Sequence, residues 1–67
     1  MASSAKNHAI KVAAEMVGGP ARLRDRLKVS SADVAAWLAG TREPPQEIFL
    51  RTVEIILDEV ERKERGS

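Results

Sequence analysis

Few side chains in this sequence could carry out covalent chemistry. It has one histidine, His8, and no cysteine, so a thiol nucleophile, a thiolate metal site and a disulfide are excluded. No acidic cluster lies at a metal-ligand spacing from His8, and Ser30 and Ser31 have no adjacent base to activate a hydroxyl. The turn Gly18-Gly19-Pro20 lacks the following Lys-Ser or Lys-Thr of a phosphate-binding loop. We therefore expect no enzyme activity, no metal, no cofactor and no small-molecule substrate.

Positive charge is concentrated in the middle of the chain. The 67 residues include 11 basic and 10 acidic side chains, which gives a net charge of +1. Residues 1–19 carry a net +1, residues 20–42 a net +3, and residues 43–67 a net −3. A basic surface can contact the phosphates of nucleic acid, whereas an acidic one repels them. The middle third is therefore the candidate nucleic-acid surface.

The arginines of this middle third do not form one patch. Alternate residues of a helix point about 200° apart, so Arg24 diverges from its neighbours, and only Arg22 and Arg26, at i and i+4, share a face. An ordinary solvated helix face is the alternative interpretation of this cluster. The candidates for phosphate contacts are Arg22, Arg26, Lys28 and Arg42, with a hydroxyl contact from Thr41.

Glycine and proline divide the chain into four segments with helical periodicity, and these must position the candidate residues. The breaks are Gly18-Gly19-Pro20, Gly40 and Pro44-Pro45. We expect helices at about 4–17, 20–27, 31–39 and 45–62. Glycine suits a left-handed helix end, and proline suits the first position of a helix.

The third segment has a clear beginning. Ser30 is a suitable N-cap, and Asp33 three residues later resembles the acidic half of a capping box. Gly40 would close this helix. The side chains expected to pack the second and third helices together are Leu23, Leu27, Val34, Trp37 and Leu38.

The last segment has no glycine or proline between Pro45 and Arg62. At about 100° per residue, most of its apolar side chains form one arc of about 120°. We expect this arc to pack on the core: Phe49, Leu50, Val53, Ile56, Leu57 and Val60. Ile48 and Ile55 fall together outside the arc and predict a dimer interface. Scattered exposed isoleucines, which are common, are the alternative interpretation.

Length and composition indicate one small all-α domain over residues 1–67. A chain of this size buries only roughly 60% of its unfolded surface, enough for a single core. We expect a compact four- or five-helix bundle with a long C-terminal helix and with disordered ends at 1–4 and 64–67. No apolar run approaches the about 20 residues of a membrane span, and the N-terminus has no apolar signal region. We therefore expect a cytoplasmic protein with no membrane partner.

The spacing of residues 23–45 is typical of one recognition unit. In order, the matching positions are Leu23, Leu27, Val29, Ser30, Val34, Trp37, Gly40 and the pair Pro44-Pro45. Through them the chain resembles the helix-turn-helix unit of the Cro and phage-repressor family, and with its flanking helices the resemblance covers most of the sequence. It implies a lambda-repressor-like fold and a small bacterial or prophage-type transcriptional regulator. Such a regulator would bind double-stranded DNA as a homodimer.

The resemblance also implies how DNA would be bound. The third helix, about 31–39, would lie in the major groove. The positions facing the groove would be Ser30, Ser31, Ala32, Ala35 and Ala36. Backbone N–H groups near Ala21 and Arg22, at the start of the second helix, would meet a phosphate.

The sequence departs from the family pattern around the turn and on the third helix. Arg24 stands where the family has a small alanine, and Lys28 stands where it has glycine, so Lys28 either takes a left-handed conformation or the turn is built differently. The groove-facing positions hold no Arg, Lys, Asn or Gln, so direct base readout should be weak. The alternative function is a protein-interaction module in which the Ser-Ala face and Ile48 with Ile55 contact a partner protein.

Overall fold

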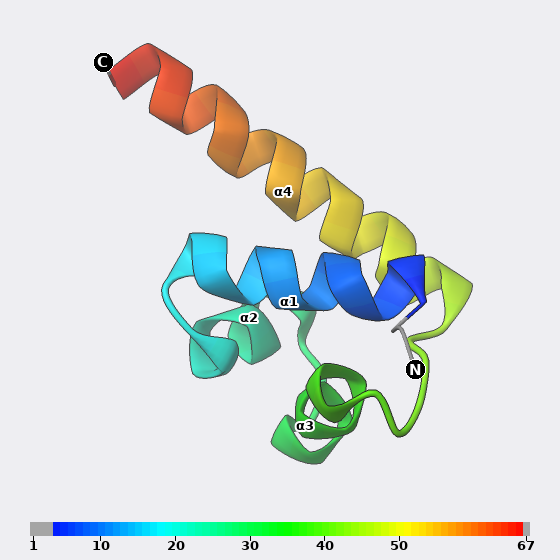
Figure 1. The fold of residues 1–67 in the computed structure, drawn as a ribbon. Coiled ribbons are helices and arrows are strands. Elements are labelled where there is room, and N and C mark those ends of the chain that lie inside the picture. The colour runs from blue at the N-terminus through cyan, green and yellow to red at the C-terminus, as the bar shows by residue number, and fades with distance from the viewer. Residues whose placement is uncertain (1–3, 67) are drawn as a thin grey trace.

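The computed structural model describes residues 4–66, which form four α-helices joined by short connections (Figure 1). The helices are α1 Ala5–Val17, α2 Pro20–Leu27, α3 Ser31–Ala39 and α4 Gln46–Gly66. No strand occurs in this part of the chain. The expected all-helical class is confirmed, and the number of helices is the lower of the two expected. None of the four helices is long and apolar enough to cross a membrane.

Local chemistry sets the helix ends. The Ser30 hydroxyl accepts the Asp33 N–H at 3.1 Å and caps α3, as its sequence position predicted. Gly18 and Gly40 end α1 and α3 with φ of 102° and 81°, a region that glycine enters without a side-chain clash. Pro20 begins α2, where its missing N–H needs no partner.

Lys28 ends α2 in the left-handed conformation, at φ 59° and ψ 48°. It is the only non-glycine residue with positive φ between residues 4 and 66. Of the two possibilities raised by the sequence, the strained lysine is therefore the correct one. The conformation costs about 1 kcal/mol relative to glycine, and the Lys28 N–H closes the helix by donating to the Arg24 carbonyl at 2.8 Å.

The chain ends are more ordered than expected. Ser4 is the N-cap of α1 and accepts the Asn7 N–H. Residues 64–66 continue α4, which we expected to end at about Arg62. The basic Lys63 and Arg65 lie in its last turn, where positive charge is favourable to the helix dipole. Residues 1–3 and 67, the rest of the expected disordered ends, lie outside the described residues.

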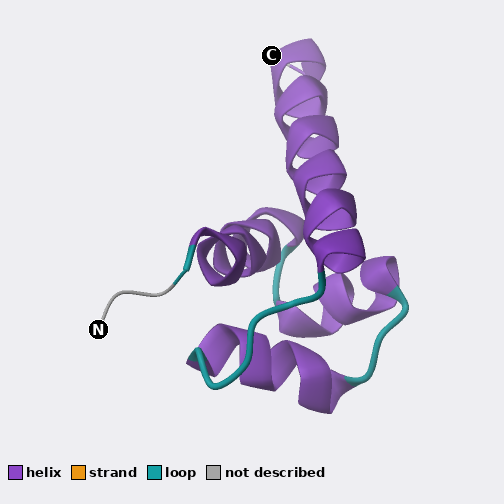
Figure 2. Cartoon of the chain, turned by 90° about the vertical axis from the view of Figure 1, so that its right-hand side faces the viewer, coloured by secondary structure: helices purple, strands orange, loops and turns teal. Residues whose placement is uncertain are grey.

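The core forms around α1, which packs against each of the other three helices (Figures 1 and 2). α3 packs against α1 and α2, on the side away from α4. The buried apolar side chains are Ile10, Ala13, Ala14, Val17, Leu23, Leu27, Val34, Trp37 and Ile55. They come from all four helices, so each helix depends on the others for its position.

The apolar faces of α4 differ from those that the sequence predicted, although Ile56 packs against the core as expected. Ile55 is buried with 9% of its surface exposed, and Ile48 packs against the core, so the prediction of these two as an exposed dimer interface is wrong. The exposed side chains belong to the arc expected to be core: Leu50 at 53%, Leu57 at 59% and Val60 at 38%. Thr52 is fully buried on the same face as the two isoleucines. Burial of its hydroxyl is tolerated because the hydroxyl donates to the Ile48 carbonyl at 2.8 Å, within the same helix.

A buried amide that the sequence analysis did not single out joins α1 to the end of α3. Asn7 is buried, with 6% of the residue exposed. Its side-chain Nδ2 donates to the carbonyls of Trp37 at 2.9 Å and Arg42 at 2.8 Å. Its Oδ1 accepts the Ser4 hydroxyl at 2.7 Å. Every polar atom of this amide is therefore paired, as burial requires. Asn7 shares a helical face with Ile10 and Ala14, and that register is the signal that could have located it.

We predict that Asn7→Ala lowers the free energy of unfolding by about 1–3 kcal/mol, because the carbonyls of Trp37 and Arg42 lose their donor while remaining partly buried. Urea denaturation measures the change. His8→Ala is the matched control, since His8 is an exposed neighbour on the same helix and should change stability by less than about 0.5 kcal/mol. Equal effects of the two substitutions would contradict the role assigned to Asn7.

Candidate nucleic-acid interface

α2 and α3 are held at a fixed angle by buried side chains and a tight turn. Leu23 and Leu27 of α2 and Val34 and Trp37 of α3 are each at most 4% exposed, as their spacing predicted, and Leu38 is partly buried. The turn consists of Lys28, Val29 and Ser30, in which the Val29 N–H donates to the Arg24 carbonyl at 3.3 Å. The orientation of α3 is therefore set by the core and not by its own exposed face.

The outer face of α3 carries only small side chains. Four of the five residues expected to face a groove are exposed, namely Ser30, Ser31, Ala32 and Ala35, while Ala36 is half-buried. Figure 2 shows α3 along the edge of the molecule opposite the projecting end of α4. A ligand could therefore approach this helix without meeting α4, and its backbone could come close because no large side chain stands in between.

The start of α2 lies beside this surface and has no side-chain cap. Its N-cap is Gly19, which offers no side-chain acceptor, and Pro20 supplies no N–H. The N–H groups of Ala21 and Arg22 thus have no capping partner, as expected for a helix end that meets an anion. A small apolar hollow separates this end of α2 from α3, with Pro20, Ala21, Arg24, Ser31, Val34, Ala35 and Leu38 around it.

Arg42 is tied to the first turn of α3. Its Nη2 lies 2.7 Å from Oδ1 of Asp33, and the loop that carries it is fixed by Asn7. Hydrogen bonding to the Arg42 guanidinium lowers the pKa of Asp33 below its ordinary value, and a hydrogen bond with the Ser30 hydroxyl lowers it further to a smaller extent. Thr41 is also engaged, since its hydroxyl donates to the Ala36 carbonyl at 3.2 Å. The sequence placed Arg42 and Thr41 as contacts for a ligand but gave no sign of these internal partners.

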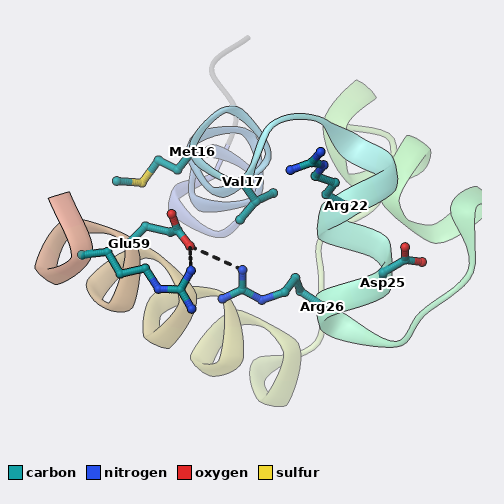
Figure 3. A pocket seen from close by; sticks show the side chains of 7 residues that line it. Met16, Val17, Arg22, Asp25, Arg26 and Glu59 are labelled. Carbon is teal, nitrogen blue, oxygen red and sulfur yellow. Dashed lines mark hydrogen bonds and ion pairs between the residues drawn. The ribbon is translucent and has the colours of Figure 1, made fainter. Parts of the chain in front are cut away.

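Arg26 lies on the other side of α2, against α4. Its guanidinium is 3.4 Å from Glu59 and 3.7 Å from Asp58, and Figure 3 shows Glu59 reaching toward it. Arg22 lines the same pocket as Arg26 and Glu59, between α1, α2 and α4, so the two arginines do share a face, as predicted. Arg26 reaches across to α4, so the structure does not bring it together with the exposed residues of α3, whereas Arg22 lies at the start of α2 beside Gly18.

The remaining basic residues differ in how much of their charge is compensated. Arg24 pairs with Asp25 at 2.9 Å. Arg22 and Lys28 make no ion pair with any residue in 4–66. Two side chains therefore carry most of the uncompensated positive charge of the middle third, and Lys28 stands in the turn directly before α3.

We predict that Arg42→Ala raises the pKa of Asp33, because the hydrogen bond that favours its ionised form is lost. A carboxyl-detected NMR titration measures this pKa. In the intact protein the pair stabilises the fold above the ordinary Asp pKa of about 3.9, and this contribution is lost as the pH falls through the lower pKa of the folded state. Arg51→Ala, which breaks an exposed pair with Glu47 on α4, should leave the Asp33 titration unchanged. An unshifted Asp33 in Arg42→Ala would show that the guanidinium does not hold the carboxylate in solution.

Comparisons with known proteins found no matching family model, no matching curated protein and no matching solved structure. Within residues 4–66, no group of three or more His, Asp or Glu side chains is placed to hold a metal ion. A function for this chain therefore rests on the chemistry of its own surface, and the most distinctive part of that surface is the small-residue face of α3 with the uncapped start of α2 beside it.

Proposed function

We propose that the chain is a DNA-binding transcriptional regulator of the Cro and phage-repressor type. In this proposal α2, the turn at 28–30 and α3 act as a helix-turn-helix, and α3 lies in the major groove. The observation that carries it is the combination of an exposed, small-residue α3 with the uncapped start of α2 and the unpaired Lys28. Each of these features suits a phosphate-lined groove.

The mechanism assigned to α3 is close approach with weak base readout. A major groove about 12 Å wide admits an α-helix. Serine hydroxyls at 30 and 31 can donate to or accept from base edges, and the methyl groups of Ala32 and Ala35 can contact thymine methyls. None of these residues makes a bidentate contact, so sequence preference per copy is small. Two copies on half-sites about 34 Å apart would combine their binding, which is why we propose a homodimer.

Phosphate contacts are assigned to Arg22, Lys28 and the N–H groups at the start of α2. Arg26 is excluded from this set because Asp58 and Glu59 already hold it. The acidic α4 projects on the side away from α3 (Figures 1 and 2), so its carboxylates would not face the phosphates. The charge distribution therefore permits α3 to approach DNA even though the whole chain is nearly neutral.

The proposal is tested by titrating the 67-residue chain against a labelled random-sequence duplex by fluorescence anisotropy at several salt concentrations. We predict that affinity falls steeply with salt and that Arg22→Ala reduces the log–log slope by about 0.9, the contribution of one phosphate. Arg51→Ala, on the outside of α4, should leave the slope unchanged. Absence of binding at about 50 mM salt, where phosphate contacts are strong, would overturn the proposal.

Asp33 gives a second prediction because its charge opposes DNA binding. Its carboxylate neutralises Arg42 and stands in the first turn of the helix proposed to enter the groove. Asp33→Asn should therefore raise affinity for random duplex by about three- to tenfold and steepen the salt slope by about 0.9, because Arg42 becomes available to a phosphate. Asp25→Asn is the control, since that carboxylate pairs with Arg24 on α2. An unchanged or weakened Asp33→Asn would contradict this role.

A protein-interaction module on the same scaffold is the second candidate function. The apolar hollow between α2 and α3 favours it, because Pro20, Val34 and Leu38 could receive an apolar side chain of a partner protein. The same titration separates the two functions: a protein-binding surface predicts no salt-dependent affinity for duplex DNA and no effect of Asp33→Asn on it.

A further inference from the structure

α4 carries a second apolar face that no other helix covers. Leu50, Leu57 and Val60 are exposed by 53%, 59% and 38%, and Phe49 and Val53 beside them are half-buried. At about 100° per residue these five side chains occupy an arc of about 100°. The face that packs on the core, with Ile48, Thr52 and Ile55, is centred more than about 90° away from it. α4 therefore has the pattern of a helix that packs between two apolar surfaces. The core of residues 4–66 provides one of these surfaces and leaves the other face of α4 exposed.

The position of this face also distinguishes it from ordinary surface leucines. The C-terminal part of α4 projects past the other helices in both views (Figures 1 and 2). Leu57 and Val60 continue the apolar stripe toward this end of the helix, and both are exposed. A contiguous exposed apolar stripe is typical of an interaction surface.

We propose that a second copy of this chain covers this face, with the two α4 helices antiparallel about a two-fold axis near Ile56. Charge selects this arrangement. About such an axis Glu47 lies at the same level as Arg65 of the second copy, and this pair occurs twice. Glu47, Glu61 and Arg65 all lie along one edge of the apolar face at about 220–260° on the wheel from Ile48. Arg51, which is level with Glu61, falls at about 300°, outside this edge, and pairs with Glu47 of its own chain. Opposite charges thus meet along the edges of the contact.

The ion pairs inside one copy leave Arg65 available. Arg65 has no ion pair within residues 4–66, and Glu47 is paired with the exposed Arg51 at 3.4 Å, an exposed pair of the kind that contributes little. The one like-charged meeting about this axis places Glu54 near Asp58 of the second copy. Asp58 is already compensated within its own chain, by Arg26 at 3.7 Å and Arg62 at 3.5 Å. The repulsion at this point is therefore small.

A parallel pair of α4 helices fits the charges less well. In a parallel two-fold pair, the edge of one helix with Glu47, Glu54 and Glu61 faces the opposite edge of the other helix. That opposite edge contains Phe49 and Ile56 near the levels of Glu47 and Glu54, so two carboxylates would lie against apolar side chains. Glu61 alone of the three would lie near a basic residue, Lys63. The antiparallel arrangement keeps the apolar residues together and places the acidic edge beside basic residues.

The surface is tested by sedimentation equilibrium of the full chain from low to high micromolar concentration. The intact protein should be a dimer in this range, and Leu57→Glu should raise the dissociation constant at least about tenfold because it places a charge in the centre of the contact. Circular dichroism checks that the variant is folded, and Ala21→Glu, an exposed position on α2, is the control that should leave the dimer intact. A monomer at high micromolar concentration, or an unaffected Leu57→Glu, would overturn the proposal and leave the face to a different partner protein.

The antiparallel register has a sharper test. Glu47→Arg and Arg65→Glu should each weaken the homodimer severalfold, because like charges then meet twice at the same level. A mixture of these two variants should form a heterodimer of nearly the original affinity, since opposite charges meet again in both positions. No preference for the heterodimer would refute the register. This proposal concerns the homodimer that the proposed function also includes, and these measurements involve no DNA. A monomer would remove the homodimer and leave the duplex titration to test DNA binding, whereas a dimer that does not bind duplex would overturn DNA binding alone.

Discussion

The buried Asn7 amide fixes the geometry on which the rest of the molecule depends. Its two N–H groups hold the carbonyl of Trp37, near the end of α3, and that of Arg42, in the loop that leads to α4. With its backbone held, Arg42 extends its guanidinium to Asp33 at the other end of α3. The Asn7 side chain therefore holds the C-terminal end of α3 by direct hydrogen bonds, and through Arg42 it also helps to position the first turn of α3. Because these bonds form in a poorly hydrated interior, each is stronger than it would be in water.

The small core explains why α4 retains an unpaired apolar face. α1 packs against each of the other three helices, and the nine buried apolar side chains gather around it. A helix of the length of α4 can lay only one face on such a core. Its second apolar face then either stays in water, at a cost of roughly 25 cal/mol per Å², or is covered by another chain. The second apolar face of α4 is thus a consequence of the small core, which can cover only one face of so long a helix.

Features that depend on neighbouring residues could be predicted from the sequence, and features that depend on distant ones could not. The Ser30 cap and the Gly18 and Gly40 ends follow from residues within one turn, and the left-handed Lys28 was one of two alternatives that the local sequence allowed. The orientation of α4 does not follow from nearby residues, because a helical wheel shows two apolar arcs and does not indicate which of them faces the core. Thr52 made the true core face look narrower than it is, since its hydroxyl is satisfied by its own helix. The partners of Arg26 lie 32 and 33 residues away along the chain, and the partner of Arg42 lies 9 residues away. No local pattern therefore indicated these ion pairs.

Internal pairing greatly reduces the positive charge that the middle third can offer a ligand. Arg24, Arg26 and Arg42 each face a carboxylate, which leaves Arg22 and Lys28 without an ion pair among the described residues. Two cations and a helix N-terminus give a single copy only a weak, salt-sensitive attraction to phosphate. Small side chains on α3 add little preference for particular bases. If α3 does bind DNA, a useful affinity has to come from linking two such surfaces, because the second then binds at the effective concentration set by the first. An exposed apolar face on α4, remote from α3, is a place where that link could form without covering the surface that binds.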